Sequence, residues 1–185
     1  MSKLDLSVRE IQQEDVRNIV DYFLKADHQY LLNMGVDIAK VPSEEQFYSY
    51  LSGQIKLPIE ERISFCIIWL VDGIPIGHSN TNPTSFGKEA FMHLHIWKPD
   101  ERRKGMGAEL LRLTLAMFFE KLQLQDLYCQ PYAHNPAPHA TLAKNGFEFV
   151  KEYVTVPGML NFEQPVKLWH MSKEKFEKLN SGKLI

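Results

Sequence analysis

Apolar residues recur along the chain with two periods, one helical and one extended. The apolar positions within residues 14–26 are three or four apart: Val16, Ile19, Val20, Phe23 and Leu24. This spacing predicts an amphipathic helix. Side chains in residues 89–97 alternate instead, which predicts a strand with Ala90, Met92, Leu94 and Ile96 on one face. The opposite face carries Phe91, His93, His95 and Trp97.

The same periods predict the remaining elements. Strands are expected at residues 6–11, 63–71, 74–79, 126–130, 147–156 and 166–171, and helices at residues 43–53, 109–122, 135–145 and from residue 172 onward. Ser43 and Gln46 form a capping-box pair, and Asp72-Gly73 is typical of a hairpin turn. Residues 28–37 are expected to be irregular. This order predicts one α+β domain over residues 1–185, with a mixed sheet, helices on its faces, and a terminal helix and tail at 172–185.

Composition narrows the class of protein. The chain has 185 residues, 44% of them hydrophobic, and a formal net charge of −2, which excludes a disordered chain and gives no basic field for a nucleic-acid partner. Its longest apolar runs, such as residues 65–71, are far shorter than the roughly 20 residues that cross a bilayer, so no membrane partner is expected. The amino terminus lacks the apolar stretch of a secretory signal, and we expect a cytoplasmic protein. Cys66 and Cys129 are then expected to be buried free thiols.

Residues 102–108 join a predicted strand to a predicted helix. The segment holds three cations, Arg102, Arg103 and Lys104, followed by Gly105 and Gly107. A helix amino terminus presents unpaired N–H groups and a partial positive charge, and glycines let an anion approach closely, so this segment is a candidate phosphate cradle. A plain tight turn before a helix is the alternative. The absence of a Walker A or full G-x-G-x-x-G motif argues against P-loop and dinucleotide-binding enzymes.

The pattern Arg102-x-x-Gly105-x-Gly107-Ala108 resembles the acyl-CoA pyrophosphate loop of the GNAT superfamily of N-acetyltransferases. A second block resembles a later helix of the same superfamily: Asn135, Ala140, Leu142, Lys144 and Gly146-Phe147. Two motifs in the right order, one helix and one strand apart, are more specific than either alone. Within the superfamily the likeness is nearest the branch of ribosomal-protein alanine acetyltransferases and their relatives.

The resemblance implies a fold and an activity. The fold would be a mixed, mostly antiparallel sheet of about seven strands flanked by helices, with a splayed strand pair that opens the acyl-CoA slot. The activity would be acetyl transfer from acetyl-CoA to a primary amine of a peptide N-terminus or a small molecule. The residues expected to bind the cofactor are Ile96, Trp97, Arg102, Arg103, Lys104, Gly105, Met106, Gly107, Ala108 and Asn135. A non-catalytic acyl-CoA-binding module is the alternative, because Leu142 stands where many members carry a tyrosine that protonates the leaving thiolate; Tyr132 or water would have to replace it.

Acyl transfer needs a neutral amine. At pH 7, deprotonation costs about 1.4 kcal/mol for an α-amine and roughly 4.6 kcal/mol for a lysine side chain. His93 and His95, with an ordinary pKa of about 6.5, are candidate bases for that proton. The alternative is a pair of half-buried histidines that pack on Phe91 and Trp97. A metal site completed by His134 and His139 is disfavoured for want of a nearby carboxylate, and no metal is expected.

The acceptor is expected to contact the first two helices and the loop between them, which are not committed to the cofactor. The candidates are Tyr22, Asp27, His28, Tyr30 and Met34, with Asp27 or Asp37 available for a cationic acceptor. The loop 157–165, with Phe162 and Glu163, is expected to cover the acceptor from the other side. The partner is thus an amine-bearing small molecule or peptide, and both a monomer and a homodimer remain open.

Overall fold

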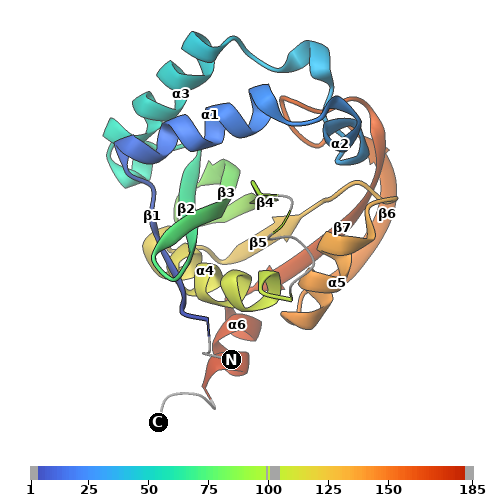
Figure 1. Ribbon diagram of the computed structural model, residues 1–185. Helices are drawn as coiled ribbons and strands as arrows, with labels where there is room; N and C mark the ends of the chain where they lie inside the picture. The colour runs from blue at the N-terminus through green and yellow to red at the C-terminus, as the bar shows by residue number, and fades with distance from the viewer. Residues whose placement is uncertain (1–3, 99, 101–104, 182–185) are drawn as a thin grey trace.

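The computed structural model describes residues 4–98, 100 and 105–181 (Figure 1). In these residues seven strands form one sheet in the order β1-β2-β3-β4-β5-β7-β6. The strands are β1 (Leu6–Glu10), β2 (Phe65–Val71), β3 (Ile74–Ser85), β4 (Glu89–Ile96), β5 (Asp126–Cys129), β6 (Glu148–Thr155) and β7 (Gln164–Ser172). The helices are α1 (Val16–Lys25), α2 (His28–Asn33), α3 (Glu44–Lys56), α4 (Gly107–Lys121), α5 (Pro136–Lys144) and α6 (Lys173–Asn180). Short 3₁₀ turns lie at Gln13–Asp15, Ile38–Lys40 and Ile59–Glu61.

One strand pair differs from the rest of the sheet. Within the sheet β4 and β5 are parallel, and the other neighbouring strands are antiparallel. The β4–β5 pairing covers Glu89 to Phe91 opposite Asp126 to Tyr128, and the two strands part beyond those residues. The mostly antiparallel α+β sheet with a splayed strand pair is therefore confirmed.

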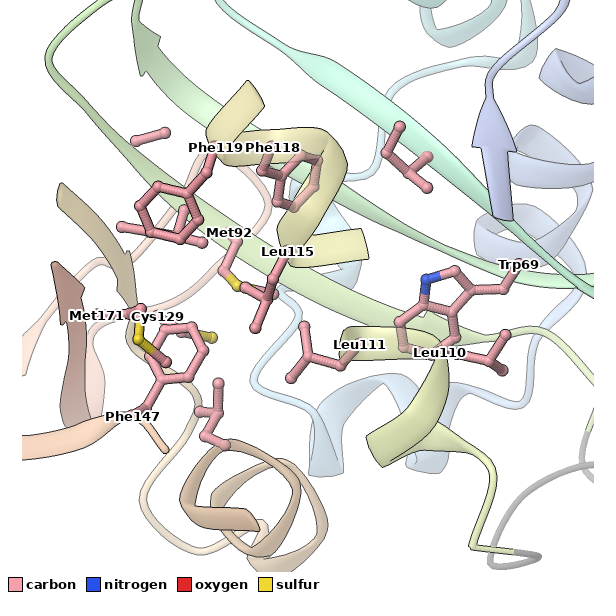
Figure 2. Packing of buried hydrophobic residues seen from close by; sticks show 14 of the residues in the cluster. Trp69, Met92, Leu110, Leu111, Leu115, Phe118, Phe119, Cys129, Phe147 and Met171 are labelled. Carbon is pink, nitrogen blue, oxygen red and sulfur yellow. The ribbon is translucent and has the colours of Figure 1, made fainter. Parts of the chain in front are cut away.

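Two apolar cores lie on the two faces of the sheet. Because alternate side chains of a strand point to opposite faces, the fully buried β2 contributes to both cores. Phe65, Ile67 and Trp69 pack with α4 in one core, and Cys66 and Ile68 pack with α1 and α3 in the other. Figure 2 shows the first core around Trp69 and α4, and the indole Nε1 donates to Thr114 Oγ1 at 2.8 Å. The buried polar atom is thus satisfied.

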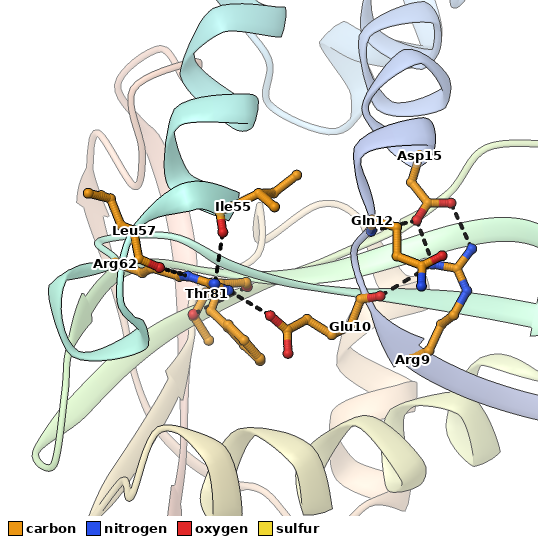
Figure 3. A network of polar contacts seen from close by, with 9 residues as sticks. Arg9, Glu10, Gln12, Asp15, Ile55, Leu57, Arg62 and Thr81 are labelled. Atoms are coloured by element: carbon orange, nitrogen blue, oxygen red, sulfur yellow. Dashed lines mark hydrogen bonds and ion pairs between the residues drawn. The ribbon is translucent and has the colours of Figure 1, made fainter.

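Two arginines anchor the helical layer to the sheet (Figure 3). Arg9 of β1 donates to the carboxylate of Asp15, with 2.9 Å from Nη2 to Oδ1, and the Asp15 side chain is 2% exposed. Arg62 donates to Glu10 Oε1 at 2.7 Å and to the carbonyls of Ile55 and Leu57, both at 2.9 Å. These contacts hold the start of α1 and the end of α3 above the sheet.

Three local predictions are corrected by the structure. Residues 28–33, expected to be irregular, form α2, because the Asp27 side chain caps the helix by accepting from Tyr30 N at 2.9 Å. The strand expected to end at residue 79 continues to Ser85, since β3 pairs with β4 again beyond an irregularity between Thr81 and Thr84. Helix α4 begins at Gly107, two residues earlier than expected. Cys66 and Cys129 are buried and free, as expected.

Candidate active site

A cavity of about 550 Å³ opens where β4 and β5 part and continues beneath α1 and α3. Side chains of β3 and β4 form its floor, α1 and α3 one wall, and the segment after β5 another. Its lining includes Phe23, Met34, Phe47, Tyr50, His78, Asn80, Asn82, Met92, His93, Leu94, His95, Gln130, Tyr132, Asn135, Leu160 and Asn161. The structure thus brings the two histidines and the tyrosine predicted to be catalytic to the same cavity.

His93 is held in one tautomer. Its Nε2 lies 3.0 Å from the carbonyl oxygen of Asn82, and a carbonyl can only accept, so Nε2 carries the proton and Nδ1 carries the lone pair. Burial lowers the pKa of His93 below its ordinary value, and the hydrogen bond to Asn82 opposes that effect. The ring is therefore neutral at pH 7 and can accept a proton at Nδ1.

His95 belongs to an aromatic cluster that its sequence neighbours did not predict. Its ring stacks on His78 of β3 with centroids 4.7 Å apart, and its Nδ1 lies 3.5 Å from the hydroxyl of Tyr22. Trp97 Nε1 donates to Nδ1 of His78 at 2.7 Å, which leaves the His78 proton on Nε2. Burial, helped by the charge of His93, lowers the pKa of His78 to about 3. His95 thus packs on His78 and Tyr22 rather than on Phe91, whose ring stacks on Tyr128.

The residues predicted to bind the acceptor are divided by the structure. Met34 lines the cavity, whereas Tyr22 and Tyr30 are not among the lining residues described. Their hydroxyls lie 3.2 Å apart, and the Tyr22 hydroxyl is in contact with the His95 ring. Asp27 caps α2, and His28 is exposed on the first turn of that helix. Asp37 accepts from Ala39 N at 3.1 Å and lies 3.8 Å from Lys40 Nζ. Neither aspartate is among the lining residues described, so neither is placed to meet a cationic acceptor there.

The loop after β6 closes the cavity. Asn161 Nδ2 and Gln164 Nε2 both donate to the carbonyl of Gly35, at 2.8 and 3.0 Å. Asp37 N donates to Leu160 O at 2.7 Å, and Lys40 Nζ donates to Asn161 O at 2.7 Å. These contacts fasten the loop to the segment after α2. Of the loop expected to cover the acceptor, residues 157–161 and Gln164 line the cavity, whereas Phe162 packs on Tyr132 and Glu163 is exposed.

The amino terminus of α4 is suited to an anion. No side chain caps this terminus in the part of the chain that is described, and Met106 occupies the capping position. The amides of Gly107 and Ala108 lead the helix and have no carbonyl ahead of them within it. Gly105 has φ +78°, a conformation that favours glycine, and among the described residues a Cβ on Gly107 would come nearest to Thr141 Oγ1, at 4.0 Å. Arg102, Arg103 and Lys104, predicted to assist here, lie outside the described residues.

Strand β4 directs alternate backbone groups into the slot. The carbonyl of His93 accepts from Ser79 Oγ at 2.7 Å, and Trp97 N donates to Ile76 O at 2.9 Å. The backbone N–H and C=O groups of the odd-numbered residues of this segment therefore point toward β3. By alternation, the amide and carbonyl of Leu94 face the space left by β5. Of the two residues predicted to pair with the pantetheine arm, Ile96 is the last residue of β4 and the Trp97 amide belongs to the sheet.

Helix α5 frames the far side of the slot. Asn135 and Tyr132 line the cavity, but Leu142, in the position where the resemblance places a tyrosine, is fully buried in the core beside α4. His139 accepts from Trp169 Nε1 at 3.1 Å and donates through Nε2 to Tyr132 O at 3.1 Å. Both of its nitrogens are engaged, and the ring holds the backbone at Tyr132.

Sequence reasoning missed His78, Tyr50 and Asn82. Asn82 orients His93, and its Nδ2 donates to Tyr50 OH at 3.4 Å. The signal for His78 was its place in a strand beside the predicted histidine strand, since β3 and β4 pair His78 with His95. Tyr50 lies on the third helix, whose polar face carries no pattern that marks a site.

The described residues hold neither a grouped set of metal-ligating side chains nor a helix that spans a membrane. Among them, no three His, Cys, Asp or Glu side chains are grouped so as to hold a metal ion. The described helices are also too short or too polar to cross a membrane.

Comparison with known proteins gives one family and a set of similar structures. Residues 5–148 match the family model described as acetyltransferase (GNAT) domain. Spermidine N-acetyltransferase from Vibrio cholerae, solved with CoA and spermine, has a TM-score of 0.75 at 17% identity, over 92% of this chain and 97% of that one. The ribosomal L7/L12 α-N-protein acetyltransferase RimL, solved with CoA, has a TM-score of 0.73 at 14% identity, over 92% and 95%.

A third structure, aminoglycoside acetyltransferase AAC(6')-Ib with CoA and kanamycin, has a TM-score of 0.71 at 14% identity, over 94% of this chain and 98% of that one. At such identities the likeness shows the fold. No curated protein matches the sequence.

Proposed function

The chain belongs to the acetyltransferase (GNAT) family, and from that premise we propose that it transfers the acetyl group of acetyl-CoA to a primary amine held in the cavity beneath α1 and α3. The observation that carries the proposal is the meeting of two features at one place. The slot between β4 and β5 runs into a cavity that is lined by His93, a neutral histidine with its lone pair on Nδ1. A cofactor slot and a proton acceptor for an amine are the two requirements of direct acyl transfer.

Acetyl-CoA fits the residues around the slot. The uncapped start of α4 and the glycines at 105 and 107 suit a pyrophosphate, and the inward carbonyl of Leu94 suits an extended arm beside the strand. When bound, the thioester supplies an activated acetyl group. Asn135, at the start of α5 and on the cavity wall, would hold the arm from the opposite side.

The protein's contribution is to position groups and move protons. His93 would take the proton of the attacking amine at Nδ1, directly or through water, while Asn82 keeps its other nitrogen protonated. The amide of Leu94, which faces the slot, would stabilise negative charge on the acetyl oxygen. The new bond joins the amine nitrogen to the acetyl carbon, the carbon–sulfur bond breaks, and Tyr132 would return a proton to the sulfur. Tyr132 is proposed here because Leu142, buried in the core, has no proton to give.

A non-catalytic acyl-CoA-binding module is the second candidate, and the buried Leu142 favours it. One experiment separates the two. Purified protein is mixed with acetyl-CoA and a panel of amines, and thiol release and acetylated product are measured beside CoA binding by calorimetry. The enzyme proposal expects thiol release that depends on both acetyl-CoA and amine. CoA binding without acetylated product from any amine would favour the binding module.

A further inference from the structure

The acceptor cavity contains no formal charge in the part of the chain that is described. None of its described lining residues is an aspartate, glutamate, lysine or arginine. The two aspartates nearest in sequence to the lining residue Met34 are committed elsewhere: Asp27 caps α2, and Asp37 caps the turn that follows it. A cation that entered would therefore find no carboxylate to pair with among the described lining residues.

The wall of the cavity shows what such an environment does to positive charge. Burial is the largest cause that lowers the pKa of each of the three histidines on it, His78, His93 and His95. Desolvation opposes any cation in the same way. The reacting amine loses its proton before attack, so it escapes this penalty, but a second ammonium group on the same molecule would keep its charge and its penalty.

What the cavity offers instead is apolar surface and neutral hydrogen-bonding groups. Phe23, Phe47, Met34 and Met92 supply aromatic and flexible apolar contacts, and each lies on a different element or connection of the fold. Asn80 and Tyr50 supply neutral polar atoms on the same walls. Such a lining stabilises an apolar or aromatic body with a few neutral polar groups.

We infer that the acceptor is an amine on an apolar or aromatic body that carries no second positive charge. The inference rests on the proposed function and names its substrate class. It distinguishes the proposed acceptor from the polyamine and the aminoglycoside that are bound in two of the similar structures. A free arylalkylamine and the N-terminus of an apolar peptide share this chemistry.

The test measures kcat/KM at pH 7.5 with the full chain, acetyl-CoA and four acceptors: 2-phenylethylamine, an apolar tetrapeptide with a free N-terminus and no charged side chain, spermidine and kanamycin. We expect kcat/KM for 2-phenylethylamine or the tetrapeptide to exceed that for spermidine and kanamycin by at least about 100-fold, a ratio of the size that one unpaired buried polar group causes. Which of the two apolar acceptors is faster identifies the source of the amine. Equal or higher values for spermidine or kanamycin would overturn the inference and leave the acetyltransferase proposal standing.

A binding measurement keeps the inference open to failure if no acceptor turns over. With CoA present, calorimetry should show 2-phenylethylamine or the tetrapeptide binding at least about tenfold tighter than spermidine. Selective binding without turnover would support the cavity's preference while the proposed function fails. Tighter binding of spermidine, or no binding by either apolar amine, would reject the inference.

A single substitution should reverse part of the preference. Asn80 lies opposite His93 in the β3–β4 register and lines the cavity, so Asn80→Asp adds a carboxylate of the same shape to the wall. The ratio of kcat/KM for 1,4-diaminobutane to that for 2-phenylethylamine should rise at least about tenfold. Both amines use the same base, so any effect of the new carboxylate on His93 cancels in the ratio.

Gln29→Glu provides the matched control, because it adds the same charge on an exposed position of α2 outside the lining. Its ratio should equal that of the unmodified chain. An unchanged ratio in Asn80→Asp, or an equal rise in both variants, would show that charge in this cavity does not select the acceptor.

Discussion

The two sides of the cavity are built in different ways. The proposed cofactor side comes mainly from β4 and the start of α4, with Asn135 added from α5, and it would work largely through backbone groups such as the amides of Leu94, Gly107 and Ala108. The acceptor side is assembled from side chains on α1, α3, β3 and the loop after β6, which are far apart in the sequence. Recognition through the backbone requires glycine and helix geometry, which leave a motif, whereas recognition through side chains leaves no local pattern.

This difference has a consequence for specificity. Backbone amides at a helix start suit any pyrophosphate of the right reach, so the cofactor side can stay the same among relatives that acetylate different amines. Each acceptor-side residue can change without disturbing the sheet. This difference between the two sides can be tested by substitutions that change the cofactor side or the acceptor side alone.

The largest effect is expected on the cofactor side, from Gly107→Glu. The glutamate would put a carboxylate at the start of α4, where the pyrophosphate is proposed to lie, and the two negative groups would repel each other. CoA affinity, measured by calorimetry, should fall by at least about 100-fold. Gly107→Ala is the matched control, since its Cβ meets its nearest atom at 4.0 Å, and it should bind CoA as the unmodified chain does. Normal CoA affinity in the glutamate variant would refute the placement of the pyrophosphate.

His93→Ala should disable the acceptor side and leave the cofactor side intact. With the proposed base absent, kcat/KM for the amine at pH 7 should fall by about 100-fold while CoA affinity is unchanged. The deficit should shrink as pH rises toward the pKa of the amine, because more amine then arrives neutral. In the unmodified chain, burial lowers the pKa of His93, so activity should be kept on acidification until the pH is below the ordinary histidine value.

The control for that variant is His28→Ala, which removes an exposed histidine outside the cavity lining. It should have the activity of the unmodified chain at every pH. A deficit in His93→Ala that does not change with pH would assign His93 a packing role instead.

The cofactor side could be predicted from the sequence better than the acceptor side. The alternation in residues 89–97 was enough to place His93 and His95 on one face of β4, and the glycines at 105 and 107 were enough to predict the start of α4 as an anion site. Both signals are local. The group that protonates the thiolate was harder to predict, because Leu142 occupies the position on α5 where the resemblance places a tyrosine. Leu142 packs into the core around α4, which explains why that position can be apolar here.

The acceptor side could not be predicted in the same way. Asp27 and Asp37 were plausible partners for a cation until the structure showed that both cap short helical turns. Gln164, the first residue of β7, donates to the carbonyl of Gly35, 129 positions away, and no periodicity relates the two. His78 joined the site through the pairing of two strands. These contacts are decided by tertiary packing, and local propensity does not encode them.

The acceptor wall should also be visible in the pH dependence of stability. Burial lowers the pKa of His78 to about 3, while an unfolded histidine titrates near its ordinary value, so the unfolded chain gains a proton on acidification that the folded chain does not. Stability is therefore complete above the ordinary value and is lost as the pH falls toward 3. Relative to His78→Asn, which cannot titrate, the free energy of unfolding should fall by about 1.4 kcal/mol per pH unit below pH 6. Urea unfolding of both proteins between pH 7.5 and 5 measures the slopes, and parallel curves would show that His78 is protonated in the folded protein.

The smallest effect is expected at Gly53. This residue lies on α3, which contributes to the acceptor wall, but Gly53 itself does not line the cavity. Gly53 is exposed within α3, and a Cβ there would meet nothing within 4 Å. Gly53→Ala should raise the free energy of unfolding by about 0.5–1 kcal/mol, because alanine restricts the unfolded chain and favours the helix. Urea unfolding gives the change, and kcat/KM should stay the same because α3 contributes Phe47 and Tyr50 to the cavity from a position that the substitution does not move. If the added stability instead came with a change in kcat/KM, α3 would have to shift during the reaction, and the acceptor side would differ from the cofactor side in its motion as well as in its construction.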